Sequence, residues 1–467
     1  MTHRPISDQL VARLRQGVQT AGDLQSSLGV SSATVRRALD ELGPDRLLRM
    51  GKGRATRYGL RRIPMHCGGT AWPLHEVSPE GELQRLATLY ALEAGEWYLE
   101  PAEGHGSHPM HAGSDRGVFQ GLPWFLETAR PQGFLGSLFA KKAHQLAHFP
   151  KELELWTDDH VLAAAMLLGD DLPGNLLVGS AATRFGAPPS SLPVWSEDLL
   201  VSSMQAVLNG EAVGSSAGGE QPKFTLLAQS AEGGPVRRIV KFSPEMVTPG
   251  AQRWGDLLVA EHLANDVLRE AGIPTARTFL RLRDQRWYLE SDRFDRVGLM
   301  GRRGLSALGP LAYTLGYGGN RWSEAAQMMV EAQVLNPIQM AKVQFLQAFG
   351  RGIGNTDMHL GNLSLWGSVS SGWEIAPVYD MTPMAYIPGR TMEVAPGVRS
   401  LPVDELPAAV APWVRRYWER LANDPRLSTD FRAIARHHEQ SLSQVVQPPR
   451  PFEANSSPVT PVRRPRF

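Results

Sequence analysis

The chain has little cysteine and no long hydrophobic segment. Cys67 is the single cysteine, and the longest apolar run is the eight residues of 161–168. One cysteine excludes a disulfide framework and a cysteine-based zinc site, and it favours a reducing compartment. A membrane-spanning helix needs about twenty apolar residues, and the N-terminal residues lack the apolar segment of a secretory signal. We therefore expect a soluble, cytoplasmic protein with no membrane partner.

The charge of the chain is almost balanced overall but unevenly distributed. The 467 residues contain 48 Lys and Arg against 47 Asp and Glu, and 42% of them are hydrophobic, which excludes general disorder. At about 150 residues per domain, this length predicts about three domains. Residues 1–62 contain twelve Lys and Arg but five Asp and Glu. A basic head on a mildly acidic body indicates a polyanion partner for the head, although a solvated basic face explains the charge equally well.

Shifts in composition divide the chain into four segments. The basic stretch stops near residues 61–64, and a loop rich in proline and serine covers 185–193. After Val446, 21 residues contain six prolines and four arginines. Such a tail cannot bury enough apolar surface to offset its ordering entropy. The predicted units are a head at 1–62, a subdomain at 63–210, a catalytic region at 211–446 and a disordered tail at 447–467.

The head has the pattern of short helices joined by a tight turn. Residues 6–17 predict a first helix, and residues 20–42 fit two more that meet at Gly29, where a positive φ is accessible without strain. Ser31 is a favourable N-cap for the last helix. That helix presents to solvent the residue types that touch base edges and phosphates in the major groove, namely Ser32, Thr34, Arg36 and Arg37.

Two predicted strands around a glycine turn follow these helices. The turn at 51–53 carries Lys52 and is followed by Arg54, so both cations are placed to meet a phosphate backbone. Helices followed by a basic wing predict a winged helix-turn-helix domain that binds double-stranded DNA. The alternative is a three-helix packing module with no role in DNA binding.

A glycine-rich loop near the middle of the chain indicates phosphate binding. Small residues let a backbone approach a phosphate closely, and a lysine at the end of the loop supplies a cation. The loop matches neither a Walker A motif nor the G-x-G-x-x-G of protein kinases, and a flexible surface turn is the alternative. Its candidate residues are Ser215, Ser216, Gly218, Gly219 and Lys223.

Lys241 lies within a short apolar strand pattern at residues 237–242. A lysine in that position needs a charged partner or a path to water. A nucleotide phosphate together with a helix carboxylate would satisfy it. Glu261, in a predicted helix at 254–268, is the candidate carboxylate, although Asp256 lies within a turn and a half on the same helix.

The segment 354–365, G-N-T-D-M-H-L-G-N-L-S-L, carries the strongest catalytic signal. Asp357 and Asn362 have the D-x-x-x-x-N spacing of phosphotransferases, in which the aspartate accepts the proton of the substrate hydroxyl and the asparagine binds Mg²⁺. A hairpin would return Asp380 beside them, where it can hold a metal that bridges nucleotide phosphates. For a lone aspartate the alternative is a turn or capping role, and for His359 it is a structural hydrogen bond.

These segments resemble the HipA-type serine/threonine kinases of bacterial toxin–antitoxin systems. Residues 354–365 are similar to that family's T-D-x-H-x-x-N-x-S loop, and 376–380 (A-P-V-Y-D) to its P-x-Y-D metal motif. Residues 291–296 (S-D-R-F-D-R) look like its E-R-F-D-R stretch at the adenine hinge, and 215–223 like its glycine loop. The resemblance covers about residues 100–440.

The resemblance implies a two-lobed, atypical protein-kinase fold of the α+β class, preceded here by the small head. It implies ATP and Mg²⁺ as cofactors, Asp357 as the catalytic base, and Asn362 and Asp380 as metal ligands. The residues expected around the nucleotide are Ser215, Ser216, Gly218, Gly219, Lys223, Lys241, Glu261, Asp292, Phe294 and His359.

The family also implies partners and a form of self-regulation. Its members phosphorylate proteins, including aminoacyl-tRNA synthetases. They also autophosphorylate a serine in the glycine loop, and this phosphorylation switches the kinase off. Here that serine would be Ser215, or Ser216 because the loop is one residue longer than the family pattern. Family members usually rely on a separate antitoxin for operator binding, so the fused head leaves open whether an antitoxin partner exists.

Three functions are therefore in competition. The leading hypothesis is an Mg-ATP-dependent serine/threonine protein kinase that acts as a toxin-like growth regulator and binds DNA. The second is a DNA-binding transcription regulator whose kinase-like region senses nucleotide without phosphotransfer. The third is a small-molecule kinase, because the D-x-x-x-x-N apparatus does not identify its acceptor.

Overall fold

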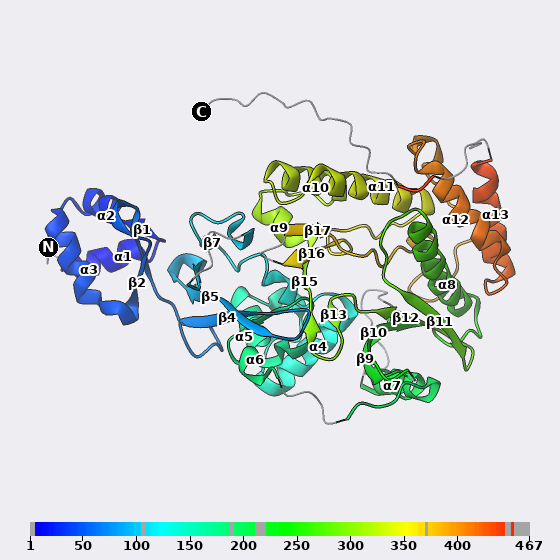
Figure 1. The fold of residues 1–467 in the computed structure, drawn as a ribbon, viewed down its shortest axis with the longest axis horizontal. Helices are drawn as coiled ribbons and strands as arrows, with labels where there is room; N and C mark the ends of the chain where they lie inside the picture. The colour runs from blue at the N-terminus through cyan, green and yellow to red at the C-terminus, as the bar shows by residue number, and fades with distance from the viewer. Residues whose placement is uncertain are drawn as a thin grey trace.

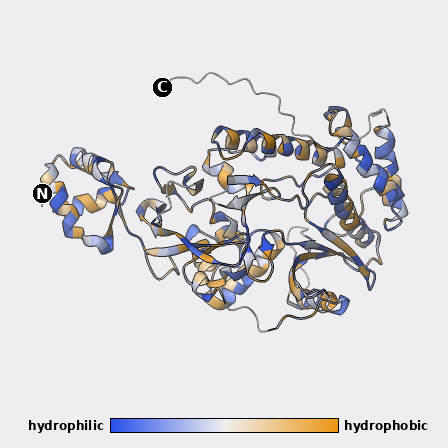
Figure 2. Ribbon diagram, viewed as in Figure 1, coloured by the Kyte–Doolittle hydropathy of each residue, from blue (hydrophilic) through white to orange (hydrophobic). Residues whose placement is uncertain are grey.

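The computed structural model describes residues 5–103, 109–186, 191–210, 221–230, 232–368, 372–443 and 450–452. Figure 1 shows the head at one end of the longest axis and helices α12 (Ala411–Asn423) and α13 (Thr429–Ser441) at the other. Figure 2 shows hydrophilic and hydrophobic residues side by side along most helices, as expected where one face packs inward. Within the described residues, no helix has the length and hydropathy required to cross a bilayer.

The head consists of three helices and a small sheet. α2 begins at a capping box formed by Thr20, and it ends at Gly29, whose φ of 66° is the left-handed value expected for the turn. Ser31 caps the next helix by accepting a backbone hydrogen bond at 3.3 Å. The first helix stops at Leu14, earlier than predicted. The elements are α1 (Ile6–Leu14), β1 (Gln19–Thr20), α2 (Ala21–Leu28), α3 (Ser32–Arg46), β2 (Leu47–Met50) and β3 (Arg57–Leu60), with sheet order β1-β3-β2.

The strand side of the head packs against the following domain. Arg57 donates to the Asp115 carboxylate at 2.9 Å, and Arg62 donates to Asp159 at 2.7 Å. Both arginine side chains are mostly buried, so these pairs fix the orientation of the head as well as adding charge attraction. An apolar cluster of Leu48, Met50, Leu92 and Val118 fills the junction.

The middle domain is an antiparallel five-stranded sheet covered by helices. Its strand order is β7-β6-β5-β4-β8. β8 lies at the edge of the sheet beside β4, and the loop at 170–175 precedes β8. The elements are β4 (Ala71–Val77), β5 (Leu83–Ala91), β6 (Glu96–Pro101), β7 (Val118–Gln120), α4 (Gly133–Ala147), α5 (Asp158–Leu168), β8 (Leu176–Val178) and α6 (Ser180–Arg184).

The first lobe is a four-stranded antiparallel sheet between two helices. Its order is β11-β12-β10-β9, so β10 is internal. Side chains alternate between the faces of a strand. Val240 and Phe242 therefore face α7, where they pack with Leu200 and Met204, and Lys241 faces α8. The elements are α7 (Glu197–Gly210), β9 (Lys223–Gln229), β10 (Pro235–Phe242), α8 (Pro249–Glu270), β11 (Thr278–Arg283) and β12 (Arg286–Asp292).

The second lobe is mainly helical, with a small sheet that follows the loop at 354–363. Strands β15, β16 and β17 form an antiparallel sheet in that order, and the predicted hairpin after this loop is β16–β17. α11 runs directly into the loop and ends at Ile353, before Gly354 with a left-handed φ of 78°. The elements before α12 are β13 (Arg296–Val297), β14 (Gly301–Arg302), β15 (Gly304–Ala307), α9 (Leu308–Thr314), α10 (Trp322–Glu331), α11 (Pro337–Ile353), β16 (Ser364–Ser368) and β17 (Gly372–Ile375).

The prediction of a disordered tail at 447–467 is wrong for residues 450–452. The carbonyl oxygen of Arg450 accepts from Trp413 Nε1 at 2.9 Å, and the Phe452 backbone N–H donates to Ala271 at 2.7 Å. The Phe452 ring lies 5.6 Å from that of Phe345. Composition missed this contact because a single aromatic residue suffices to dock a proline-rich segment on an apolar surface. The other residues of the tail lie outside the described part of the chain.

Close packing between β15 and β16 generates a stability prediction. A Cβ added at Gly304 of β15 would lie 2.0 Å from the carbonyl oxygen of Gly367 in β16. We expect Gly304→Ala to lower the free energy of unfolding by about 2 kcal/mol, because the strands must separate to admit the methyl group. Gly318→Ala is the control, since a Cβ there meets nothing within 4 Å. Equal unfolding midpoints in denaturant for both variants would contradict the expected packing.

Candidate active site

Lys241 is the centre of a charged group between the two lobes. Its Nζ lies 2.7 Å from both carboxylate oxygens of Glu261 on α8, and it also contacts the Asp380 carboxylate. The Lys241 side chain is 10% exposed and that of Glu261 is 4% exposed. A buried ammonium needs such partners, because an unpaired charge in a protein interior costs several kcal/mol.

Glu261, rather than Asp256, is the helix carboxylate that meets the lysine. Its Oε2 also accepts from Thr382 Oγ1 at 3.0 Å, and burial raises the pKa of the Glu261 carboxyl, against the attraction of Lys241. The Asp256 carboxylate instead accepts from the backbone and hydroxyl of Ser428 at 2.8 and 2.6 Å. The two acids are five residues apart, so they point to different sides of α8.

Asp380 is brought to Lys241 by the chain that leaves β17. Val378 forms a parallel bridge with Thr275, and Asp380 then adopts a φ of 55°. Burial raises the pKa of the Asp380 carboxyl, but the attraction of Lys241, and then of Lys223, outweighs it and holds that pKa at about 2. Asp380 therefore remains ionised, and its side chain is still 28% exposed.

Asp357 and Asn362 meet in the loop after α11. Asn362 Nδ2 donates to the Asp357 carbonyl oxygen at 2.8 Å and to its Oδ2 at 3.2 Å. His359 Nδ1 accepts from the backbone of Gly361 at 3.0 Å, and its Nε2 lies 3.9 Å from Asp357 Oδ1. The side chains of Asp357 and His359 are 54% and 53% exposed, so the carboxylate is open to an incoming hydroxyl group.

Asn355 ties the two acidic loops together. Its Oδ1 accepts from the Asp357 backbone at 3.0 Å, and its Nδ2 reaches the Asp380 carbonyl oxygen at 3.4 Å. Asn355 is 6% exposed. Neither Asn355 nor Thr382 was predicted as a site residue from the sequence. The available signals were an Asn two residues before Asp357 and a Thr two residues after Asp380.

The residues present fit a hard cation that is shared with a phosphate. Asn362 donates through Nδ2, and no described group donates to its Oδ1, so that oxygen is available to a cation. Asp380 supplies a carboxylate that stays ionised. Among the described residues, no three His, Cys, Asp or Glu side chains are grouped to hold a metal. Mg²⁺ suits such a site, because it usually takes one or two protein oxygens plus phosphate and water.

Lys223 and Phe294 lie near this group, whereas the Asp292 side chain does not. Lys223 is the register partner of Lys241 across β9 and β10. The Phe294 ring lies 6.0 Å from that of Tyr379, next to Asp380. The carboxylate of Asp292, a predicted nucleotide contact, accepts from Arg238 Nε at 2.8 Å on the α7 face of the sheet, opposite Lys241. Strand alternation explains the difference, since Arg238 and Lys241 are three residues apart.

The predicted glycine-loop residues lie outside the described part of the chain. They are Ser215, Ser216, Gly218 and Gly219.

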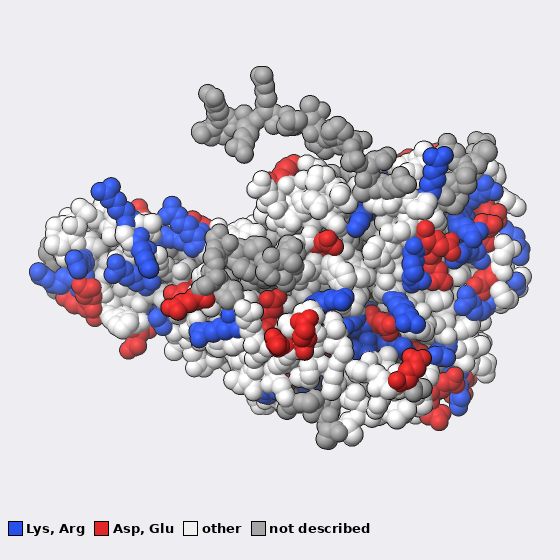
Figure 3. Space-filling view, viewed as in Figure 1, with Lys and Arg blue, Asp and Glu red and all other residues white. Residues whose placement is uncertain are grey.

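The predicted nucleic-acid contacts lie on the head. Arg36 and Arg37 are exposed on α3 together with Ser32, whereas the Thr34 hydroxyl lies 3.0 Å from that of Ser31 at the helix start. Lys52 and Arg54 are exposed in the connection between β2 and β3. Figure 3 shows Lys and Arg side chains spread over the visible face of the head.

Comparison with known proteins agrees with this arrangement. Residues 68–185 match the family model described as the YjjJ-like toxin, middle domain, and residues 215–447 match the HipA-like C-terminal domain. The chain is 34% identical over 448 residues to Toxin YjjJ of Escherichia coli (strain K12), covering 94% of this chain and 98% of that protein. This chain belongs to the HipA-like toxin family.

One solved structure shows which fold this HipA-like toxin shares. HipA in the complex of HipA, HipB and operator DNA from Shewanella oneidensis MR-1 matches with a TM-score of 0.50 and 14% identity, over 80% of this chain and 96% of that chain. The Helicobacter pylori proinflammatory kinase CtkA matches with a TM-score of 0.33 and 13% identity, over 51% and 91%. The expected two-lobed, kinase-like α+β fold is confirmed by the similarity to HipA.

The buried ion pair of this HipA-like toxin generates a second stability prediction. Glu261→Gln leaves Lys241 with Asp380 as its remaining carboxylate, so we expect a loss of about 3 kcal/mol in the free energy of unfolding, the lower end for breaking a buried pair. Glu270→Gln, on the same helix, is the control, because its carboxylate is 42% exposed and pairs with Arg420 at the surface. Chemical denaturation measures both, and a loss at Glu261 no larger than at Glu270 would contradict the expected pairing energy.

Proposed function

We propose that this HipA-like toxin is an Mg-ATP-dependent serine/threonine protein kinase that regulates growth. The proposal rests on one observation: Lys241, Glu261 and Asp380 form a buried ionic group, and Asn355 links Asp380 to the loop of Asp357. A strand lysine paired with a helix glutamate, an aspartate on a separate loop and a D-x-x-x-x-N pair are the working parts of phosphotransferases. Such enzymes accelerate the reaction chiefly by positioning and charge stabilisation.

Each of these side chains has a distinct role in the proposed reaction. Asp357 is exposed and orients the acceptor hydroxyl while taking its proton. Lys241, with Lys223 opposite it on β9, binds nucleotide phosphates. Asn362 Oδ1 and the Asp380 carboxylate would hold Mg²⁺, which when bound neutralises charge on the triphosphate. Glu261 and Thr382 keep Lys241 in place before the nucleotide arrives.

The acceptor is proposed from the family resemblance. Proteins of translation, such as an aminoacyl-tRNA synthetase, are the proposed substrates, and Ser215 or Ser216 is the proposed site of autophosphorylation. The D-x-x-x-x-N residues by themselves do not specify the class of acceptor, because both protein kinases and small-molecule kinases use them.

The head is proposed to bind double-stranded DNA as a winged helix-turn-helix. Helices α2 and α3 meet at a left-handed Gly29, and exposed cations lie on α3 and on the β2–β3 connection. A helix of this kind fits the major groove, and the connection reaches the adjacent phosphates. The S. oneidensis HipA was solved with HipB and operator DNA. An antitoxin is therefore a proposed partner here too, alongside direct contact of the head with DNA.

A transcription regulator that senses nucleotide without phosphotransfer is the second candidate. The observation that favours it is the junction at which Arg57 and Arg62 dock the head firmly on the body. Such a junction would transmit a change in the body to the DNA-binding surface. Phosphate transfer distinguishes the two candidates.

Replacement of the proposed base tests the kinase. We expect Asp357→Asn to lower phosphate incorporation by at least about a hundredfold, because the amide cannot accept the proton of the hydroxyl. Nucleotide binding should persist, since Asp357 contacts neither Lys241 nor Glu261. Labelled ATP with Mg²⁺, followed by mass spectrometry of the glycine-loop peptide and of candidate proteins, measures transfer.

The exposed Asp284 provides the control for this experiment, as Asp284→Asn removes the same charge in a turn remote from the lysine. Transfer by Asp357→Asn at the rate of this control would overturn the assignment. Tight ATP binding without transfer by the unaltered protein would favour the nucleotide sensor.

Charge removal on the head tests DNA binding. We expect the pair Arg36→Ala and Arg37→Ala to weaken DNA binding by at least about tenfold. The pair Lys52→Ala and Arg54→Ala should make the slope of log binding constant against log salt concentration shallower by about one to two units. Each phosphate contact that is lost means that binding releases about one counterion fewer. Fluorescence anisotropy with duplex DNA over a salt series measures both.

The control is the pair Lys141→Ala and Lys142→Ala on α4, which removes two positive charges from an exposed surface outside the head. DNA affinity that falls equally in this control would show that net charge, and not the head, determines binding.

A further inference from the structure

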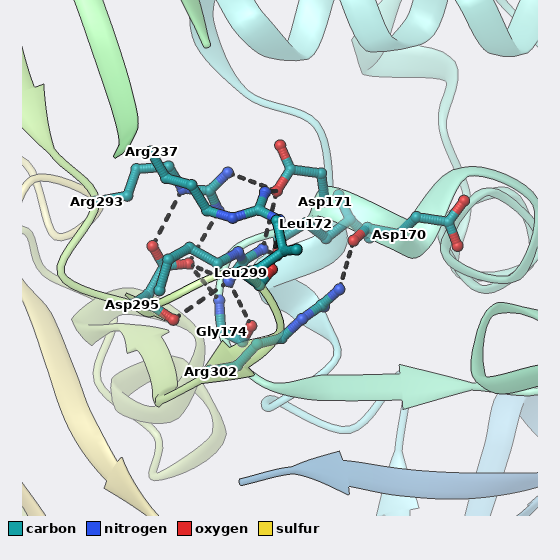
Figure 4. Close-up of polar contacts among 10 residues, drawn as sticks. Asp170, Asp171, Leu172, Gly174, Arg237, Arg293, Asp295, Leu299 and Arg302 are labelled. Atoms are coloured by element: carbon teal, nitrogen blue, oxygen red, sulfur yellow. Dashed lines mark hydrogen bonds and ion pairs between the residues drawn. The ribbon is translucent and has the colours of Figure 1, made fainter. Parts of the chain in front are cut away.

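An ionic cluster joins the middle domain to the segment that connects the lobes (Figure 4); Arg293, Arg296 and Asp295 are buried in it, whereas the Asp171 side chain is 47% exposed. We call it the hinge cluster. It lies on residues 293–302 and on β10, and the middle-domain loop at 170–175 closes over it. Its charged members are Asp171, Arg237, Arg293, Asp295, Arg296 and Arg302.

Asp171 is the member that connects three parts of the chain. Its Oδ1 accepts from Arg293 Nη1 at 2.8 Å and from Arg296 Nη2 at 3.2 Å, and Arg237 Nη1 lies 3.8 Å away. Arg237 belongs to β10 of the first lobe, and the other two arginines flank Phe294 in the connecting segment. A carboxylate of the middle domain thus contacts both the lobe and the connection. The two also meet directly, because Arg237 Nη2 donates to the Leu299 carbonyl oxygen at 2.8 Å and the Arg293 backbone N–H donates to that of Arg237 at 2.9 Å.

Asp295 is the second carboxylate, and it already has several donors. It accepts from Arg293 Nη2 at 2.9 Å, from Arg296 Nη1 at 2.7 Å and from the backbone of Gly174 at 3.0 Å. Arg296 in turn donates to the carbonyl oxygens of Leu172 at 2.6 Å and Gly174 at 2.9 Å. The middle-domain loop is therefore engaged through its backbone as well as through Asp171.

Positive charge is in excess within the hinge cluster, where four guanidinium groups face two carboxylates. Burial lowers the pKa of Arg237 and Arg302, and the neighbouring Arg293 adds to this effect, while Asp171 opposes it. Arg237 Nε and Arg302 Nη1 are buried without a hydrogen-bond partner among the residues that the structure describes. Asp295 already accepts from Arg293, Arg296 and the Gly174 backbone. Asp171 is therefore the carboxylate that balances the remaining positive charge of the cluster.

The hinge cluster is connected to the candidate active site along two routes. Arg237 and Lys241 project from the same face of β10, because they are four residues apart on one strand. Phe294, inside the clustered segment, lies against Tyr379 with ring centroids 6.0 Å apart, and Tyr379 precedes Asp380. Displacement of the connecting segment from β10 would therefore move Lys241 relative to Asp380.

We propose that Asp171, a residue of the middle domain, is a positioning residue for the kinase site. It counters the repulsion between the arginines of β10 and those of the connecting segment. In this way it fixes the distance between β10, which carries Lys241, and the connecting segment, whose Phe294 packs on Tyr379 next to Asp380. This inference rests on the proposed kinase function. The middle domain then acts on catalysis without touching the nucleotide or the acceptor.

The neighbouring Asp170 offers a matched test in the full-length protein. Its carboxylate points away from the hinge cluster (Figure 4). It pairs instead with Arg184 at 3.1 Å. In assays well below the unfolding temperature of the variant, we expect Asp171→Asn to lower kcat by about tenfold or more, with a smaller change in the KM for ATP. Asp170→Asn should leave both within about twofold, and the charge-conserving Asp171→Glu should recover part of kcat.

Two measurements separate this inference from the proposed function. Hydrogen exchange of peptides covering 293–302 should rise in Asp171→Asn and not in Asp170→Asn, whether or not the protein transfers phosphate. Added salt should reduce the difference in hydrogen exchange between the two variants, because it screens the excess guanidinium charge. Equal exchange and equal kcat in the two variants would overturn the role of Asp171. Absence of transfer by the unaltered protein, with the exchange difference present, would overturn the kinase function alone.

Discussion

The ammonium group of Lys241 is the constraint on which the rest of the site depends. It lies in an internal strand, 10% exposed, and it is stable there because Glu261 and Asp380 approach it from a helix and from a separate loop. Removing one carboxylate leaves an under-compensated charge, so strand, helix and loop have to meet at one point. This requirement explains why α8 packs along the sheet with Glu261 facing inward, and why the chain after β17 turns back to the first lobe at Thr275–Val378.

The same ionic group determines what the exposed residues can do. Asp380 stays ionised because the attraction of Lys241 and Lys223 exceeds the effect of burial on its pKa. Asn355 then relates the Asp380 loop to Asp357, whose carboxylate is open to solvent. The buried side of the site thus holds charge in fixed positions, and the open side presents the Asp357 carboxylate to solvent. That division suits the proposed phosphoryl transfer, where positioned charge provides most of the acceleration.

Much of this arrangement could be predicted from the sequence, because local patterns specify it. Lys241 in an apolar strand, the spacing of Asp357 and Asn362, and the cap at Ser31 all depend on neighbouring residues. Asp292 could not be placed, because its face depends on the register of β12 against β10. Asp171 gave no local signal at all, since its partner Arg293 is 122 residues away. Phe452 likewise lies in a segment whose composition favours disorder, and its contact with Phe345 belongs to the tertiary structure.

The middle domain uses the same chemistry at both of its junctions. Towards the head, Arg57 and Arg62 meet Asp115 and Asp159, and towards the lobes, Asp171 meets the arginines of the hinge cluster. Guanidinium–carboxylate contacts depend strongly on direction, whereas apolar contacts depend mainly on area. The arginines at these junctions are largely buried, but Asp115 is 80% and Asp171 47% exposed, and ion pairs of this kind add little net stability. Their placement at both junctions therefore serves orientation. A rotation of the middle domain would have to break directed contacts on both sides, which makes this domain the rigid link between the head and the two lobes.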